Sequence, residues 1–561
     1  MSLGEWIEGL LRDVRALVGE PRTPPRARPL PLPLRPEEPF SNGWREGHPE
    51  EALALELHDA LDGLGDPAAS GDAARRIAAA MRVVAPGDLA RFDETYRRAV
   101  WSRGVATEPR WLKDGSEADA YHLPQSREPV EALRVPDDSA PWVFGVLAMH
   151  PSGYVREGAV RRLAALRARD GDELPFLLLR ANDWIPAVRA AAARAVEERA
   201  ADAKYTPELV WSLPLLTRLA ESTRGEVDAV VSAVRATLEQ PAARSALLGG
   251  LHSRDRRVRR SAYALLMAGA EGAELRQLVV VGLHSEDQVR RSLAVRAVAR
   301  MDLDSMRAVL PELMSAGNPP ARTAGVQIAA KVGPEGEGWI LAAVSDRNSM
   351  VRATARFVLK GRGADFAALN RRALEAGGAD AEGALLGLGD LGRAEDAEVV
   401  EPFLAAARPH VRAAAVKTLD RLLRDAAVPA ILPLLADESP RVSRAAAKAL
   451  ETRPVPPAAL AAIFTGAHPP HARANALRLL ARGSRWEVVP WMVRGAADGD
   501  PRVAGAARKA LESLRATLYR SFQAPAPDQL ARLSTELDAA GERIDPATAK
   551  WLREVVHSYG G

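Results

Sequence analysis

The stretch ILPLLADESPRVSRAAAKAL, residues 431–450, decides the fold. One apolar run ends at an Asp-containing turn, and a second apolar run opens at Val442. Apolar residues three and four positions apart lie on one face of a helix. Two helices of about 12 residues joined by short turns occupy about 31 residues. The stretch therefore predicts one pair of helices.

This pair recurs along the chain, most visibly as a Val-Arg dipeptide followed by small and apolar residues. The arginines that follow valine are Arg156, Arg189, Arg259, Arg290, Arg352 and Arg412. The same spacing assigns six further positions: Asp228, Arg322, Glu382, Ser443, Arg473 and Ala504. Successive positions are 30 to 33 residues apart, except for one step of 39. Even spacing over so many units indicates a repeat array in which each unit buries its apolar face against its neighbours.

The repeated unit resembles the HEAT repeat, in the short variety named for phycobilisome-lyase-like proteins, over roughly Trp142 to Arg520. The Trp-Leu-Gly-Tyr pattern of tetratricopeptide repeats and the Thr-Pro-Leu-His pattern of ankyrin repeats are missing. We therefore predict an all-α fold, an α-α superhelical solenoid of about twelve HEAT-like repeats with a helical N-terminal region.

In HEAT-like families the recurrent arginine pairs with the turn aspartate of an adjacent unit, which holds the repeats in register. The resemblance implies that role for a structural ladder of nine residues: Arg156, Arg189, Arg322, Arg352, Arg412, Asp183, Asp287, Asp346 and Asp437. The alternative is that the arginines form a row that binds phosphates. Ser443 and Ala504 interrupt either arrangement.

The chain divides into five segments by composition. Residues 1–20 form an amphipathic helix, whose apolar face includes Trp6, Ile7, Leu10, Leu11 and Val14. Residues 21–40 are a Pro-rich linker, so the helix is tethered. It docks in a partner's groove, lies on a membrane, or packs back on the chain.

The other three segments follow from the repeats. Residues 41–140 are a helical N-terminal region that becomes irregular over 104–139, where no role can be read. Residues 141–520 are the solenoid, and residues 521–561 form a C-terminal helical cap over its last repeat.

Composition limits the classes of function. The 561 residues carry a formal net charge of +3, which neither favours nor excludes a nucleic-acid partner. There is no cysteine, which excludes disulfides, thiolate metal sites and cysteine nucleophiles. No run approaches the roughly 20 apolar residues of a transmembrane helix. We expect a cytoplasmic protein.

Seven arginines make the densest basic spot of the repeats. They are Arg254, Arg256, Arg257, Arg259, Arg260, Arg290 and Arg291. Only Asp255 opposes the first five. If these side chains project from one surface, they form a cationic patch suited to an acidic protein or a nucleic-acid backbone; otherwise they are solvated helix starts with nearby acids.

Catalytic patterns are missing or incomplete. HEAT-like deoxyhypusine hydroxylases bind iron through His-Glu dipeptides, and no histidine here precedes glutamate. HEAT-like DNA glycosylases use tryptophans and a carboxylate, and the candidates are Asp183, Trp184, Trp339, Trp486 and Trp491. His468 and His471 lack a third metal ligand. We therefore predict no catalytic residues, no metal and no cofactor.

The predicted function is a noncatalytic scaffold or adaptor. A solenoid of helix pairs exposes a long concave surface formed by the second helices, which suits a protein segment better than a small molecule. The alternative is nucleic-acid binding, including a relative of the DNA-repair glycosylases. The sequence does not identify the partner.

Overall fold

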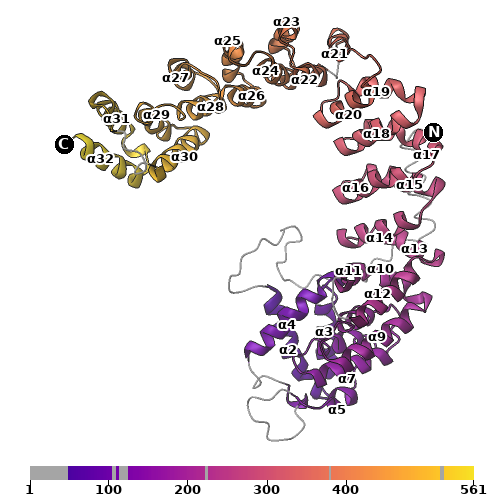
Figure 1. Ribbon diagram of the computed structural model, residues 1–561. Helices are drawn as coiled ribbons and strands as arrows, with labels where there is room; N and C mark the ends of the chain where they lie inside the picture. The colour runs from indigo at the N-terminus through magenta and orange to yellow at the C-terminus, as the bar shows by residue number, and fades with distance from the viewer. Residues whose placement is uncertain are drawn as a thin grey trace. The chain divides into compact units, whose positions relative to one another are not determined.

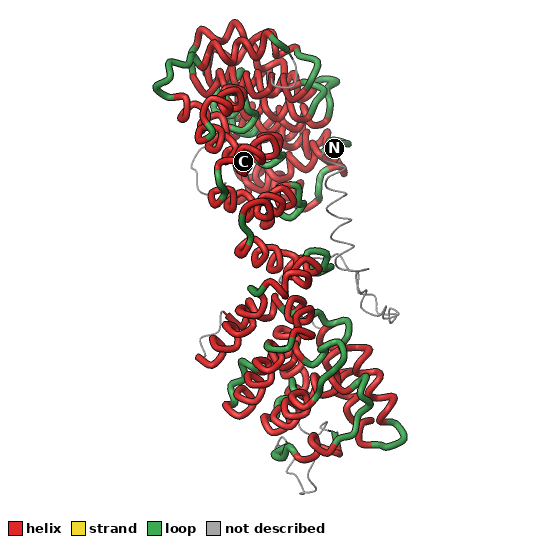
Figure 2. Tube along the Cα trace, turned by 90° about the vertical axis from the view of Figure 1, so that its right-hand side faces the viewer, coloured by secondary structure: helices red, strands yellow, loops and turns green. Residues whose placement is uncertain are grey.

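The computed structural model describes residues 49–103, 109–112, 124–220, 225–377, 381–517 and 524–560. These residues fold into helices joined by turns, and none of them lies in a strand (Figure 2). The all-α prediction is therefore confirmed. The predicted helix 1–20 and linker 21–40 lie outside the described residues.

The chain forms two compact units, Met1–Met301 and Asp302–Gly561. The described part of the first unit begins with the helices α2 (Pro49–Asp62), α3 (Ser70–Met81), α4 (Leu89–Arg103) and α5 (Glu128–Ala132). Helix pairs follow: α6 (Ala140–Leu147) with α7 (Gly153–Ala165), α8 (Leu174–Arg180) with α9 (Pro186–Ala200), α10 (Thr206–Trp211) and α11 (Leu213–Ala220) with α12 (Gly225–Leu238), α13 (Arg244–Gly250) with α14 (Arg256–Gly269), and α15 (Gly272–Leu283) with α16 (Gln288–Ala297).

The second unit continues the pattern. Its pairs are α17 (Leu303–Ser315) with α18 (Pro319–Lys331), α19 (Glu337–Ala343) with α20 (Ser349–Leu359), α21 (Phe366–Glu375) with α22 (Ala381–Leu391), α23 (Ala397–Val400) with α24 (Pro409–Leu423), α25 (Val428–Ile431) with α26 (Pro440–Leu450), α27 (Pro457–Thr465) with α28 (Pro470–Leu480), and α29 (Arg485–Ala496) with α30 (Pro501–Thr517). Two helices end the unit, α31 (Pro527–Ala540) and α32 (Pro546–Gly560). The two units together hold twelve pairs, as the period predicts.

Local sequence explains where the second helix of each pair begins. Six of them start with proline, whose fixed φ suits the first helical residue and whose missing N–H would be unbonded there. Others start after a capping side chain. Asp255 accepts from the Arg257 amide at 2.8 Å, and Asn348 accepts from the Met350 amide at 3.0 Å.

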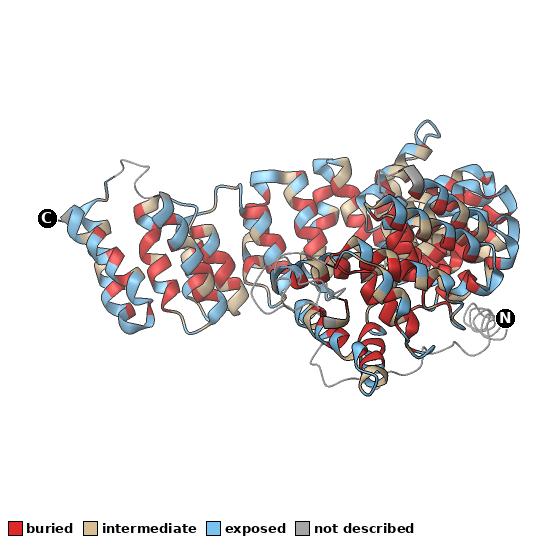
Figure 3. Ribbon diagram, turned by 90° about the horizontal axis from the view of Figure 1, so that it is seen from below, coloured by how far each residue is buried: buried red, intermediate tan, exposed pale blue. Residues whose placement is uncertain are grey.

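Successive second helices lie side by side within each unit, as α18 with α20 and α24 with α26 do (Figure 1). Their buried faces point between the helices and their exposed faces point outward (Figure 3). In the second unit one apolar core continues from Ala367 to Val555. Each repeat therefore depends on its neighbours for burial, as in other solenoids.

Both ends of the repeat array are covered. In the first unit, α3 packs on α6 and α4 packs on α8, so the N-terminal helices close the stack there. In the second unit α31 packs on α29, and the rings of Trp486 and Tyr559 meet edge-on at 5.5 Å. Among the described residues, the helices are all too short or too polar to cross a bilayer.

Candidate binding surface and the arginine–aspartate ladder

The fourth residue of most second helices is an arginine that reaches back over its own turn. Its Nη1 atom donates to the carbonyl oxygen six residues earlier, at 2.6–3.0 Å. The donors are Arg156, Arg189, Arg259, Arg291, Arg322, Arg352 and Arg412. The guanidinium therefore bonds carbonyls that the end of the preceding helix leaves unsatisfied.

The other side of the guanidinium binds a turn aspartate of the next repeat. The Nε atoms of Arg156, Arg322 and Arg412 donate to Asp183, Asp346 and Asp437 at 2.7–2.9 Å. Arg473 pairs with Asp498 through its Nη2 atom instead, while its Nε donates to the Phe464 carbonyl at 3.2 Å. Each aspartate also accepts from the backbone N–H two residues later, at 2.7–2.9 Å. One carboxylate thus shapes its own turn and fastens the preceding repeat.

We call each such Arg–Asp pair a rung of the ladder. The first rung, Arg156 with Asp183, is fully buried. The side chains of Arg156 and Asp183 are both 0% exposed, and Arg180 adds a third hydrogen bond to Asp183 at 3.0 Å. Burial alone would raise the pKa of the Asp183 carboxyl, but the hydrogen bond from Arg156 and the charge of Arg180 hold it below its ordinary value. This carboxylate is therefore charged in the folded protein and depends on both arginines.

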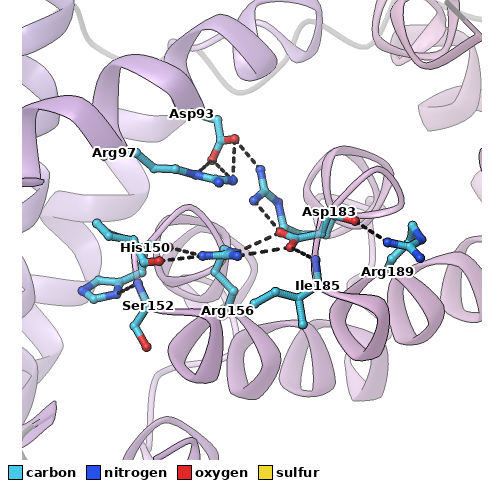
Figure 4. Close-up of polar contacts among 10 residues, drawn as sticks. Asp93, Arg97, His150, Ser152, Arg156, Asp183, Ile185 and Arg189 are labelled. Carbon is cyan, nitrogen blue, oxygen red and sulfur yellow. Dashed lines mark hydrogen bonds and ion pairs between the residues drawn. The ribbon is translucent and has the colours of Figure 1, made fainter. Parts of the chain in front are cut away.

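Arg180 extends this rung into the N-terminal region. Its Nη2 atom lies 2.5 Å from Asp93 of α4, which also binds Arg97 at 2.8 Å. Figure 4 shows Asp93 and Arg97 on one side of the cluster and Asp183 with Arg156 on the other. The cluster thus links α4, α7 and α8 through buried charges.

Not every predicted position lies in this arrangement. Arg189 bonds the Asp183 carbonyl at 2.8 Å. Arg352 pairs with Asp390 at 2.7 Å, at the far end of α22 and not in a turn. Asp287 binds Arg260 at 2.7 Å, although the period aligns it with Arg259. Asp287 is the N-cap directly before α16, whereas Asp183, Asp346 and Asp437 each stand three residues before the first residue of the following second helix.

The Val-Arg alignment is wrong by one residue at Arg290. The fourth residue of α16 is Arg291, which donates to the Ser285 carbonyl at 2.6 Å. Arg290 instead lies over the Tyr263 ring, 5.0 Å from its centroid. The capping Asp287 stands four residues before Arg291, so the cap, not the valine, sets the helix register here.

The remaining non-arginine positions contribute in other ways. The Ser443 hydroxyl donates to the Leu435 carbonyl at 2.7 Å and accepts from Asn475 at 2.9 Å, so it replaces part of the missing guanidinium. Glu382 pairs with Arg441 at 2.6 Å. Ala504 offers no polar group, and Asp228 lies on α12. The ladder therefore changes its chemistry from one repeat to the next.

The predicted cationic patch is mostly occupied by contacts within the chain. Arg257 binds Asp88 through two hydrogen bonds of 2.9 and 3.0 Å, and its pKa is raised by its hydrogen bonds to Asp88 and Asp255. Arg259 caps its own turn, and Arg260 binds Asp287. These arginines bind the N-terminal region and the neighbouring repeat.

Arg254 and Arg256 differ from the rest of that patch. Both are exposed, and neither forms an ion pair with the residues that the structure describes. Partner binding by the patch therefore stays a prediction that rests on these two side chains. The apolar face of the N-terminal helix, Trp6, Ile7, Leu10, Leu11 and Val14, lies outside the described residues.

Asp183 and two of the candidate tryptophans have structural contacts. Asp183 is buried and bonded, so it cannot serve as the carboxylate beside Trp184, which is 62% exposed. Trp486 is buried and Trp491 meets the Phe464 ring at 6.2 Å, as packing residues do. The His471 ring bonds the Asp437 carbonyl, and no group of three metal-ligating side chains occurs among the described residues.

One carboxyl group that lies apart from these residues, that of Glu208, has a strongly raised pKa. Burial raises the pKa of Glu208 to about 8, and the negative charges of Asp172, Glu173 and Asp170 add to the shift. Because an unfolded Glu titrates near pH 4.3, the contribution of protonated Glu208 to wild-type stability should be lost as pH rises from about 4 to 8. We expect Glu208→Gln to raise the thermal midpoint more at pH 8 than at pH 5. Thermal melts at both pH values test this, and an equal gain at each would contradict it.

The exposed face of the second helices is the candidate binding surface. In α24, α26, α28 and α30 the ninth helical residue is exposed and basic: Lys417, Lys448, Arg478 and Lys509. We call these four residues the basic row. In α20 the same position is Phe357, which is 77% exposed, and Met350 on the same face is 63% exposed. The basic row was missed in the sequence, although its spacing of 30 and 31 residues is a visible signal.

Comparison with known proteins confirms the predicted resemblance. A family model described as HEAT repeats matches residues 397–463, from α23 into α27. No curated protein matches the chain. The protein is therefore a HEAT-repeat-like α-solenoid.

Solved structures with similar arrangements have low identity and low TM-scores. An engineered protein is 18% identical, with 67% of this chain and 99% of that one covered and a TM-score of 0.19. Kap121p bound to Pho4p is 13% identical, with 89% and 54% covered and a TM-score of 0.29. Importin beta is 12% identical, with 88% and 68% covered and a TM-score of 0.32. The chain thus spans about half the length of Kap121p, and such values say nothing about function.

Proposed function

We propose that this protein is a noncatalytic scaffold or adaptor that binds a protein partner on the exposed face of its second helices. The observation that carries the proposal is the exposure of Met350 and Phe357 on α20. They are seven residues apart, so both lie on one face of the helix. Large apolar side chains exposed together mark interaction sites more often than scattered single ones do.

The position of Phe357 makes its exposure more informative. The four helices that carry the basic row have Lys or Arg at the equivalent position. A charged side chain is thus compatible with the fold there, and solubility would favour it. An aromatic side chain gives large contact area at low entropic cost, which is typical of residues that anchor protein partners.

The tethered N-terminal helix is proposed as a second docking element. Its apolar face, with Trp6, Ile7 and Leu10 among its residues, is suited to a partner's groove, and the Pro-rich linker gives it reach. A scaffold with two such elements could hold two components together. This part of the proposal rests on the sequence.

A nucleic-acid partner is the alternative, and the basic row supports it. Phosphate contacts would make the affinity fall steeply with salt. Apolar Met350 and Phe357 have no role in that case. We therefore favour the protein partner.

The test is affinity capture of the tagged full-length protein from its native cell after nuclease treatment. Wild type should retain a stoichiometric protein. Phe357→Lys should reduce that protein at least about tenfold, because an aromatic anchor contributes roughly 2 kcal/mol or more. Val83→Lys is the matched control, since Val83 is 60% exposed in the other unit. Equal retention by Phe357→Lys, or recovery of nucleic acid alone that nuclease abolishes, would contradict the proposal.

A further inference from the structure

We infer that the basic row binds an extended acidic segment of a protein partner, with one acidic side chain on each successive second helix. This inference rests on the proposed function and adds the chemistry of the partner. The row consists of Lys417, Lys448, Arg478 and Lys509.

The four cations are equivalent in structure as well as in sequence. In each helix the fourth residue donates its backbone N–H to the capping residue four positions earlier, so the helices share one register. Every member of the row follows that fourth residue by five positions and is exposed. Neighbouring pairs among α24, α26, α28 and α30 are in contact along the stack. The cations therefore form a line across the helices, one on each.

The surface around the row is basic or small. On the same face, the exposed or half-buried second and fifth residues of these helices are His410, Arg441, Arg444, His471, Arg502 and Gly505, whereas Ala413 and Ala474 are buried. None of these positions is acidic. Arg441 is paired with Glu382 of α22 at 2.6 Å. Lys417, Lys448 and Lys509 have no ion-pair partner among the described residues.

Acidic residues do occur one turn further along the helices. Asp420 is bound by Arg453 at 2.7 Å, and Glu451 is bound by Arg482 at 3.1 Å. Glu512, on α30, is exposed and lies three residues after Lys509. The first two carboxylates are neutralised by the next repeat, so the positive potential of the row is reduced mainly at its α30 end.

The spacing of the row suits an extended polypeptide. Packed helices are about 8–10 Å apart. A chain in the extended polyproline II conformation rises about 3.1 Å per residue with three residues per turn, so three residues span one helix spacing and every third side chain lies on the same face. A segment with an acidic residue at every third position would present one carboxylate to each cation. The ladder holds these helices in register, so the spacing is fixed before binding.

A nucleic acid fits this surface less well. Proteins that bind single strands stack bases on exposed aromatic side chains. Within the described parts of α24, α26, α28 and α30, no large apolar or aromatic side chain is exposed. Duplex DNA carries phosphates on two strands, whereas one row of four cations can follow only one. An acidic polypeptide is therefore the occupant that the surface favours.

The test measures fluorescence anisotropy with the full-length protein and a labelled peptide that carries Glu at every third position. The comparison peptide has the same composition with its Glu residues in one block. We expect the spaced peptide to bind wild type at least fivefold more tightly than the block peptide. The variant Lys417→Glu/Lys448→Glu/Lys509→Glu should weaken the spaced peptide about tenfold or more, because three attractive pairs become repulsive.

The control variant Lys331→Glu/Lys360→Glu/Lys550→Glu makes the same charge change at exposed lysines away from the row. It should bind the spaced peptide within twofold of wild type. Equal loss in both variants, or equal binding of both peptides, would overturn the inference. Tighter binding of a single-stranded or duplex oligonucleotide of equal charge would overturn it in favour of a nucleic acid. The variant Lys417→Gln/Lys448→Gln/Lys509→Gln, which removes the positive charges without reversing them, is a second test of the loss of spaced-peptide binding.

The inference and the proposed function can fail separately. If Phe357→Lys loses the captured partner while reversal of the basic row retains it, the protein is a scaffold but the acidic segment is excluded. If the spaced peptide binds as expected while Phe357→Lys loses no partner, the apolar anchor is excluded.

Discussion

Replacing Asp183 with Asn should lower the free energy of unfolding of the first repeats by about 3–5 kcal/mol, the cost of breaking a buried ion pair. Asn keeps the shape of the side chain and can still accept from the Ile185 amide, as Asp183 does at 2.9 Å. It removes the charge that Arg156 and Arg180 both bind. The buried Arg156 guanidinium would then lose its counterion, and Arg180 would keep only Asp93.

Hydrogen exchange of α7, α8 and α9, together with urea unfolding, measures this loss. The matched control is Asp287→Asn, because Asp287 also accepts from the backbone N–H two residues later and binds an arginine of the preceding repeat, but its partner Arg260 is 33% exposed. The control should lose about 1 kcal/mol or less. Since the pKa of Asp183 is lowered, the wild-type advantage should shrink as pH falls below about 4, where the unfolded carboxyl is protonated. Equal losses in the two variants would show that the buried rung has no special role.

Gly383→Ala should destabilise the second unit by about 3 kcal/mol, at the upper end of typical overpacking costs. A Cβ atom at Gly383 would lie 1.8 Å from the Ser345 carbonyl oxygen, which is backbone and cannot rotate away. The turn that would have to move contains Asp346, the carboxylate that binds Arg322 at 2.7 Å. The substitution should therefore also weaken one rung of the ladder.

Thermal unfolding and limited proteolysis between α20 and α22 test this expectation. Gly338→Ala is the control, because a Cβ atom at Gly338 in α19 meets nothing within 4 Å. Alanine in an open helical position should stabilise the protein by about 0.5–1 kcal/mol. If Gly383→Ala left the stability of the protein unchanged, α22 would not pack tightly on that turn.

The repeat architecture could be predicted because each unit carries its own signals. Apolar spacing, an aspartate in the turn and proline or a capping residue before the second helix recur about every 31 residues. These are local features, so the number of repeats follows from counting them. The displacement from Arg290 to Arg291 shows the limit, since two adjacent arginines fit the pattern and only the cap at Asp287 decides between them.

Contacts between distant parts of the chain could not be predicted in the same way. Arg257 appears in the sequence as part of a basic patch, but it binds Asp88, which is 169 residues away. Arg180 has no place in the repeat pattern, yet it joins Asp93 to Asp183. Such pairs depend on how the N-terminal helices pack on the repeats. A single sequence carries no record of that packing.

The candidate binding surface could be predicted from the sequence only in part. The basic row has a sequence period, but periodic lysines are also typical of any solvated helix face. Phe357 looks like a core residue in the sequence, and only the structure shows that it is 77% exposed. Exposure of an apolar residue is set by the neighbouring repeats and not by the helix that carries it.

The central claim is that a protein partner covers the exposed face of the second helices, and lysine footprinting of the complex tests it most directly. The purified protein would be acetylated with and without its captured partner, and each lysine would be quantified by mass spectrometry. Lys417, Lys448 and Lys509 report on the surface, while the exposed Lys204 and Lys550 are internal controls. We predict at least about threefold protection of the first three lysines and none of the controls. Unchanged labelling of Lys417, Lys448 and Lys509 in a stoichiometric complex would contradict the account.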